Sequence, residues 1–215
     1  MAKLFFRYGA MNSGKSTLLM QVAYNYEERG MRVLVMKPGC DTKGGECVVS
    51  RLGVRREVDR MITENADCRK LVQEARKEGD IHCVLVDEAQ FLQPSQVDQL
   101  FAVAVDYNIP VICYGLRTDF LGEGFPGSTR LLLLAHALEE LKTICHCGRK
   151  AVMNARKING KYIFEGSQIV IDGEDEVEYE AFCGQCYFQA RRESGILPLS
   201  GLSEDLPCPD RKESI

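Results

Sequence analysis

The sequence predicts an α/β fold, in which a doubly wound parallel sheet is followed by a smaller domain of β-hairpins. Four short runs are almost continuously apolar or β-branched, as is typical of parallel strands buried on both faces; they are residues 3–8, 32–37, 82–86 and 110–114. Helical patterns separate these runs, and an alternation of strands and helices favours right-handed crossovers. After residue 141 the sequence changes to short alternating segments with turn residues between them.

The helical patterns place apolar residues three and four positions apart. In the first pattern these residues share one face between residues 18 and 26, and Gly30 marks the end of the helix. In a later pattern they share one face between residues 97 and 104. Ser95, with Asp98 three residues on, predicts that this helix begins with a capping box at Ser95.

The segment after the first strand has the pattern G-x-x-x-x-G-K-[ST] of a phosphate-binding loop. Its glycines let successive backbone N–H groups turn toward phosphate oxygens, and the next helix adds the positive end of its dipole. Lys15 supplies a charge to the β- and γ-phosphates, and Ser16 a hydroxyl for Mg²⁺. We therefore predict that a nucleoside triphosphate binds at Gly9, Ala10, Met11, Asn12, Ser13, Gly14, Lys15 and Ser16.

Two acidic residues, Asp87 and Glu88, end the apolar run 82–86. In phosphate-loop proteins the carboxylate that ends a neighbouring strand holds Mg²⁺, so we predict Asp87 as a magnesium ligand together with Ser16. Glu88 can then reach the γ-phosphate region, either as a general base or as a group that orients water. The first role is that of a kinase and the second that of an ATPase.

Four of the ten cysteines form two close pairs late in the chain. Four thiolates fit tetrahedral Zn²⁺, and C-x₂-C is a usual spacing for the second pair. The first pair is only C-x-C, with Gly148 available for the turn, and His146 is an alternative ligand there. Asn159-Gly160 predicts a hairpin between the pairs, and Asp172-Gly173 a second turn. The predicted zinc ligands are Cys145, Cys147, Cys183 and Cys186.

These patterns divide the chain into a nucleotide-binding domain (1–143), a zinc-binding domain (144–192) and a mobile tail (193–215). A net charge of −4 argues against nucleic acid as a partner. The most apolar stretch, residues 131–135, is too short to span a membrane. Since the phosphate loop leaves no room for a signal peptide before it, we expect a cytoplasmic protein.

Taken together, GAMNSGKST, VLVDEAQF, YGLRTDFLGEGF and the late cysteine pairs with IVIDG resemble the zinc-containing type II thymidine kinase family of bacteria and animal cytosol. The likeness runs in order through residues 1–190. It implies ATP- and Mg²⁺-dependent phosphorylation of the 5′-hydroxyl of thymidine in nucleotide salvage, with deoxyuridine as an alternative acceptor. It also implies a structural zinc ion, a homotetramer and feedback inhibition by thymidine triphosphate.

The resemblance also implies roles for single residues. Glu88 would accept the proton of the 5′-hydroxyl, and Gln90 would line the ATP site. Residues 169–173 and Tyr179 match the family's lasso, a loop tied down by zinc that closes over the nucleoside. The implied thymidine-binding residues are Phe91, Leu116, Phe120, Phe125, Ile169, Val170, Ile171, Asp172, Gly173 and Tyr179. Asp172 departs from the family, which commonly has glycine there.

Two other classes of function remain open at the level of the sequence. One is a phosphate-loop ATPase with a structural zinc module, in which ATP drives a conformational or partner-binding cycle. The other is a zinc-module nucleic-acid binder with a nucleotide switch, against which the acidic balance weighs. Consumption of ATP one for one with thymidine distinguishes the kinase from both.

Overall fold

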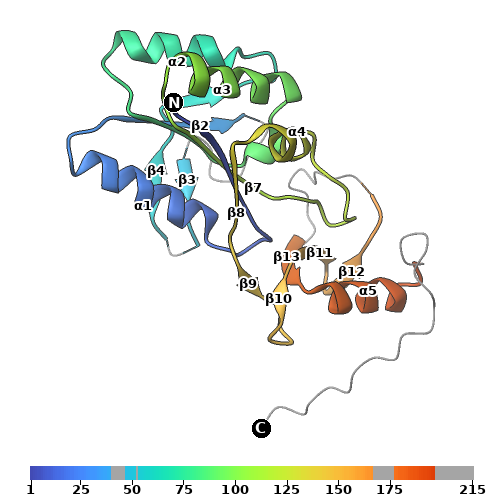
Figure 1. Cartoon of the computed structure of the whole chain (residues 1–215). Helices are drawn as coiled ribbons and strands as arrows, with labels where there is room; N and C mark the ends of the chain where they lie inside the picture. The colour runs from blue at the N-terminus through green and yellow to red at the C-terminus, as the bar shows by residue number, and fades with distance from the viewer. Residues whose placement is uncertain (40–46, 52, 167–176, 197–215) are drawn as a thin grey trace.

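The structure is a computed structural model that describes residues 1–39, 47–51, 53–166 and 177–196 (Figure 1). Its larger part is a six-stranded sheet with the order β5-β2-β6-β7-β1-β8, in which every neighbouring pair is parallel. The strands are β1 (Leu4–Tyr8), β2 (Val33–Pro38), β5 (Arg60–Ile62), β6 (Cys83–Val86), β7 (Val111–Gly115) and β8 (Ala137–Glu140). The predicted parallel sheet is therefore confirmed, and the four expected strands form its centre.

Helices cover both faces of this sheet. On one face lie α2 (Cys68–Lys77), α3 (Pro94–Asp106) and α4 (Pro126–Leu134), and on the other lies α1 (Lys15–Glu27) (Figure 1). Each face has its own buried core: Val72, Leu100 and Leu131 belong to the first, and Leu19 and Ala23 to the second. The sheet is thus doubly wound, as its alternating pattern predicted.

Two features of the larger part differ from the sequence-based expectation. The cap of α3 is Gln93, which forms a capping box with Gln96, so the prediction of Ser95 was wrong. The reason is Pro94, whose fixed φ and missing N–H suit the first helical position and place the cap one residue before it. The strands β5 and β8 were missed because they lie at the edges of the sheet, where one side remains exposed and no continuous apolar run is needed.

The smaller part is built from two small sheets and a helix. A three-stranded antiparallel sheet has the order β12-β11-β13, with β11 (Met153–Ile158), β12 (Lys161–Ile163) and β13 (Val177–Phe182). Asn159 and Gly160 have φ angles of 48° and 81° and form the expected hairpin turn. The turn at Asp172-Gly173 lies outside the described residues. Beside this sheet are the strands β9 (Thr143–Ile144) and β10 (Lys150–Ala151) and an unexpected helix, α5 (Gly184–Glu193).

This smaller part packs against the phosphate loop. Its core joins Phe164, Phe182 and Tyr187 to Ala10, which belongs to the loop. The boundary predicted after residue 143 falls at β9, and the division into three units remains a prediction. Another hairpin, β3 (Cys47–Val49) with β4 (Arg55–Glu57), lies near α1 (Figure 1). Within the described parts of the chain, we find no helix long and apolar enough to cross a membrane.

Candidate active site

The phosphate loop connects β1 to α1 and is closely packed at its start. A Cβ atom on Gly9 would lie 2.5 Å from the carbonyl oxygen of Leu141 and 2.5 Å from Ser13 Oγ, so only glycine fits there. Gly14, the residue before α1, has a φ of 78°, which glycine adopts without strain. The loop and the start of α1 therefore have the tight turn that anion binding by backbone N–H groups requires.

Lys15 lies inside this loop rather than on the surface. Its Nζ donates to the carbonyl oxygen of Ala10 at 2.9 Å and to Ser13 Oγ at 3.4 Å. Burial lowers the pKa of Lys15, while the nearby carboxylates of Glu88 and Asp87 act in the opposite direction. The charge of Lys15 in the phosphate loop is thus stabilised by the two carboxylates that follow β6.

Asp87 follows β6 and faces the start of α1. Its Oδ2 accepts a hydrogen bond from Ser16 Oγ at 3.2 Å, although the two residues are 71 positions apart. Its buried Oδ1 has no hydrogen-bond partner among the described residues. Burial, and then the neighbouring Glu88, raise the pKa of Asp87 to about 7. A buried carboxylate oxygen with a hydroxyl beside it fits a Mg²⁺ ion, a hard cation that prefers oxygen ligands and would favour the ionised form.

Glu88 has a φ of 49°, in the left-handed region that non-glycine residues rarely adopt. Its Oε2 accepts a hydrogen bond of 2.6 Å from Gln90 Nε2. The other end of the same amide, Gln90 Oε1, accepts from the backbone N–H of Leu116 at 3.1 Å. Gln90 therefore connects the Glu88 carboxylate to the segment that follows β7. A Cβ atom on Gly115 would lie 2.8 Å from Gln90 Oε1, so glycine leaves room for this connection.

The apolar residues expected around thymidine differ in exposure. Phe120 and Phe125 are buried, and the Phe125 ring packs edge-on against Phe91 with 5.6 Å between centroids. Leu116 and Phe91 are only partly buried and lie near Gln90. Tyr179 lies in β13 opposite Arg156. The remaining expected residues, 169–173, lie outside the described residues.

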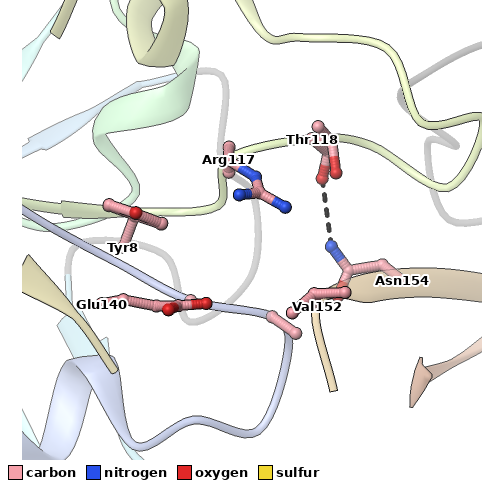
Figure 2. A pocket seen from close by; sticks show the side chains of 8 residues that line it. Tyr8, Arg117, Thr118, Glu140, Val152 and Asn154 are labelled. Atoms are coloured by element: carbon pink, nitrogen blue, oxygen red, sulfur yellow. Dashed lines mark hydrogen bonds between the residues drawn. The ribbon is translucent and has the colours of Figure 1, made fainter. Parts of the chain in front are cut away.

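The segment after β7 also contacts the smaller part of the protein. The Arg156 guanidinium carbon lies 3.6 Å from the centroid of the Phe120 ring, and Tyr187 Oη donates to the carbonyl oxygen of Phe120 at 2.7 Å. Between this segment and the phosphate loop is a small pocket, shown in Figure 2. It is lined by Tyr8, Gly9, Ala10, Arg117, Thr118, Glu140, Val152 and Asn154.

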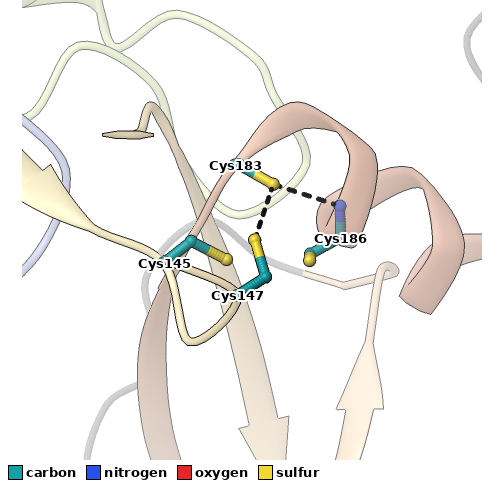
Figure 3. A group of neighbouring side chains, drawn as sticks. All are labelled: Cys145, Cys147, Cys183 and Cys186. Atoms are coloured by element: carbon teal, nitrogen blue, oxygen red, sulfur yellow. Dashed lines mark hydrogen bonds between the residues drawn. The ribbon is translucent and has the colours of Figure 1, made fainter. Parts of the chain in front are cut away.

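The four predicted zinc ligands lie together, with their Sγ atoms all within 4.8 Å of one another (Figure 3). Cys183 caps the start of α5, where its Sγ accepts from the backbone N–H of Cys186 at 3.5 Å. Gly148, with a φ of 82°, provides the turn after Cys147. The short C-x-C spacing therefore does not prevent the first pair from meeting the second.

The surroundings of these thiols fit a tetrahedral zinc ion. The backbone N–H of Arg149 stabilises the Cys147 thiolate and lowers its pKa to about 6, whereas burial raises the pKa of Cys145 and Cys186. Backbone N–H groups that donate to thiolates are compatible with a metal that requires deprotonated ligands. His146 lies outside this group, and its Nδ1 is 3.3 Å from Glu180 Oε1.

Sequence reasoning missed Asn154, Arg156 and Tyr187, which join the smaller part to the segment after β7. Asn154 and Arg156 alternate on one face of β11, and both are nearly fully buried. A polar alternation in a hairpin strand normally indicates a solvent-facing side. The alternation of Asn154 and Arg156 in the sequence therefore indicated exposed side chains, whereas both are buried.

Comparison with known proteins gives a consistent result. A model of the family described as "Thymidine kinase" matches residues 2–187. The chain is 48% identical to the thymidine kinase of enterobacteria phage T4 over 91% of this chain and 100% of that one. It is 51% identical to the thymidine kinase of Chromobacterium violaceum over 87% of this chain and 98% of that one. The thymidine kinase of Rhodopirellula baltica is 47% identical over 95% of this chain and 97% of its own.

Proposed function

Because the chain belongs to the thymidine kinase family, we propose a role in that reaction for each part of the site. The protein is an ATP-dependent kinase that transfers the γ-phosphate of ATP to the 5′-hydroxyl of thymidine. Its substrates are ATP and thymidine. The roles of the individual residues, the metal ions and the assembly are proposals, for which the geometry provides support.

We assign ATP to the phosphate loop. The N–H groups of Gly9 and Met11 are bonded within the protein, so the other backbone N–H groups of residues 9–16 and the N-terminus of α1 would face the phosphates. Lys15 would neutralise the charge that develops during transfer. Ser16 and Asp87 would hold Mg²⁺, supported by their contact of 3.2 Å and the unpartnered Asp87 Oδ1. When bound, this ion supplies further neutralisation of the phosphate oxygens.

We assign general-base catalysis to Glu88. The carboxylate accepts the proton of the thymidine 5′-hydroxyl as that oxygen attacks the γ-phosphate. This assignment rests on two hydrogen bonds of the Gln90 amide. Its Nε2 donates to Glu88 Oε2 at 2.6 Å, and its Oε1 accepts from the Leu116 N–H at 3.1 Å. Through Gln90, the base and the segment assigned to the nucleoside have fixed relative positions. Fixed positions matter because phosphoryl transfer depends on alignment more than on covalent help.

Thymine would bind among Phe91, Leu116, Phe120 and Phe125, with Tyr179 and residues 169–173 closing over it. The first four gather after β6 and β7, at the carboxyl ends of parallel strands, where ligands of such sheets bind. Since Phe120 and Phe125 are buried, they would support the segment after β7 from its buried side, whereas Phe91 and Leu116 can contact the thymine ring.

Zn²⁺ would be held by Cys145, Cys147, Cys183 and Cys186 and would have a structural role. Four protein ligands leave no open coordination position for catalysis. The small core of the cysteine-containing part is of a size that usually requires a bound metal for stability. The metal would fix the base of the lasso, because β13 lies between the lasso residues and Cys183.

The remaining assignments concern regulation, assembly and location. Thymidine triphosphate carries both a thymine and a triphosphate, so it can act as a feedback inhibitor by occupying both sites. A homotetramer is supported by two exposed apolar side chains, Leu133 near the end of α4 and Leu138 on the edge strand β8. We place the protein in the cytoplasm, where free thiols persist. Neither nucleic acid nor a membrane is a partner in this proposal.

The test is a chromatographic assay for thymidine monophosphate, made with full-length protein, Mg²⁺ and ATP, with and without thymidine. We expect one monophosphate for each ADP formed, and little ADP when thymidine is omitted. ADP formation that is independent of thymidine would instead support the ATPase reading, in which Glu88 orients water.

A further inference from the structure

Asn154 is the one residue for which the described structure shows hydrogen bonds to both the phosphate loop and the segment after β7. Its Oδ1 accepts from the backbone N–H of Met11 at 2.7 Å. Its Nδ2 donates to the carbonyl oxygen of Thr118 at 3.0 Å (Figure 2). The side chain is 3% exposed, so water does not compete strongly for either partner.

The two partners determine which side chain can stand at this position. The Met11 N–H can only donate and the Thr118 carbonyl can only accept, so the residue between them must accept at one end and donate at the other. An amide does both, and the partners also fix its orientation without ambiguity. A carboxylate of the same size can accept but cannot donate, and an apolar side chain does neither.

The Met11 N–H belongs to a loop in which backbone donors typically face phosphate oxygens. Because this N–H donates to Asn154 of the smaller part instead, the hydrogen bond orients the loop relative to that part. Asn154 lies in β11, the central strand of its sheet, paired with Ala181 of β13. The connection is therefore made from a well-supported element.

From these contacts we infer that Asn154 is a positioning residue that sets the relative placement of the donor phosphate and the nucleoside. The inference rests on the proposed assignment of ATP to the phosphate loop and of thymidine to the segment after β7. Gln90 connects that segment to the base, and Asn154 connects it to the phosphate loop. Together they fix the three groups that must align for in-line transfer.

Two other contacts to this segment do not involve Asn154. Tyr187 Oη donates to the Phe120 carbonyl at 2.7 Å, and Arg156 stacks on the Phe120 ring. Loss of Asn154 should therefore shift the segment relative to the phosphate loop without releasing it. Such a shift should lower kcat while the KM values for ATP and thymidine change little, because each substrate keeps its own contacts.

The test compares Asn154→Leu and Asn154→Asp with wild type and with Asn108→Asp. Asn108 is exposed and its Oδ1 accepts from the Ala2 N–H, so its conversion to aspartate is the same chemical change away from the site. Full-length, zinc-loaded proteins are assayed well below their thermal unfolding temperatures. For both Asn154 variants we expect kcat to fall by about tenfold or more, with each KM within about threefold of wild type. Asn108→Asp should match wild type.

Three results would overturn the inference. One is a wild-type kcat in Asn154→Leu together with a lower unfolding temperature, which would make the residue merely structural. Another is a nearly normal Asn154→Asp, which would mean that only the phosphate-loop bond matters. The third is a rise in one KM at unchanged kcat. Failure of the proposed function would look different, since wild type itself would then form no thymidine monophosphate.

Discussion

The parallel-sheet part and the smaller cysteine-containing part are stabilised in different ways. The sheet has a large apolar core on each face, with Leu4, Phe6 and Leu85 fully buried. The smaller part buries a few aromatic rings among alanines and cysteines, and its core extends to Ala10 of the other part. A core of that size rarely supports a fold without a metal or a partner surface. The difference suggests that the sheet carries the chemistry and that the smaller part positions the acceptor.

The largest expected effect is that of Glu88→Gln. The amide keeps the size of the side chain but cannot accept the proton of the 5′-hydroxyl, so kcat should fall by ~10²–10⁴-fold. Affinity for ATP, measured by calorimetry, should stay close to that of wild type. The exposed Glu74 on α2 offers a matched control, and Glu74→Gln should behave as wild type. If Glu88→Gln kept more than about one tenth of the wild-type kcat, Glu88 would not be the general base.

Lys15→Ala should have the next largest effect and should act on ATP alone. Loss of a charged donor at the β- and γ-phosphates should weaken ATP binding by roughly 10–10²-fold and lower turnover with it. Thymidine affinity without nucleotide should change little. The exposed Lys77 is the matched control as Lys77→Ala. Equal losses of affinity for ATP and thymidine would show that the substitution acts through folding.

Cys186→Ser should separate the two parts. With a ligand lost, zinc content should fall, and the KM for thymidine should rise about tenfold while that for ATP changes little. The matched change is Cys83→Ser in the buried strand β6, which should lower the unfolding temperature but leave zinc content unaltered. Metal analysis and kinetics on the same samples decide the matter. Undiminished zinc in Cys186→Ser, or none in wild type, would contradict the assignment.

The smallest effect concerns the cap of α3. Gln93→Ala removes the side-chain half of the capping box, while the backbone N–H at position 93 can still donate to Gln96 Oε1, and should cost about 1 kcal/mol, or about 2–4 °C in unfolding temperature. Ser95→Ala should cost less, since Ser95 is not the cap. Neither change should alter kcat. A larger effect at Ser95 than at Gln93 in thermal unfolding would restore the original expectation from sequence.

The sequence predicted the parts of the fold whose signal is local. The buried central strands, the phosphate loop and the Asn159-Gly160 turn each depend on a few adjacent residues. The cysteine cluster was predictable from spacing because metal ligands leave a compositional trace. Asn154 was not predictable, because both of its partners are backbone atoms and leave no trace in the sequence. The helix α5 was missed because its polar residues outnumber its buried ones, Tyr187 and Ala190.

The most direct test of the central claim compares two rates in wild type and in Cys186→Ser. The first is the slow hydrolysis of labelled ATP without thymidine, and the second is thymidine phosphorylation at subsaturating thymidine. If the sheet carries the chemistry and the smaller part positions the acceptor, hydrolysis should be retained in the variant while phosphorylation falls about tenfold. If both rates fall in proportion, the phosphate-transfer site itself depends on the cysteine-containing part, and the division of labour proposed for this protein is wrong.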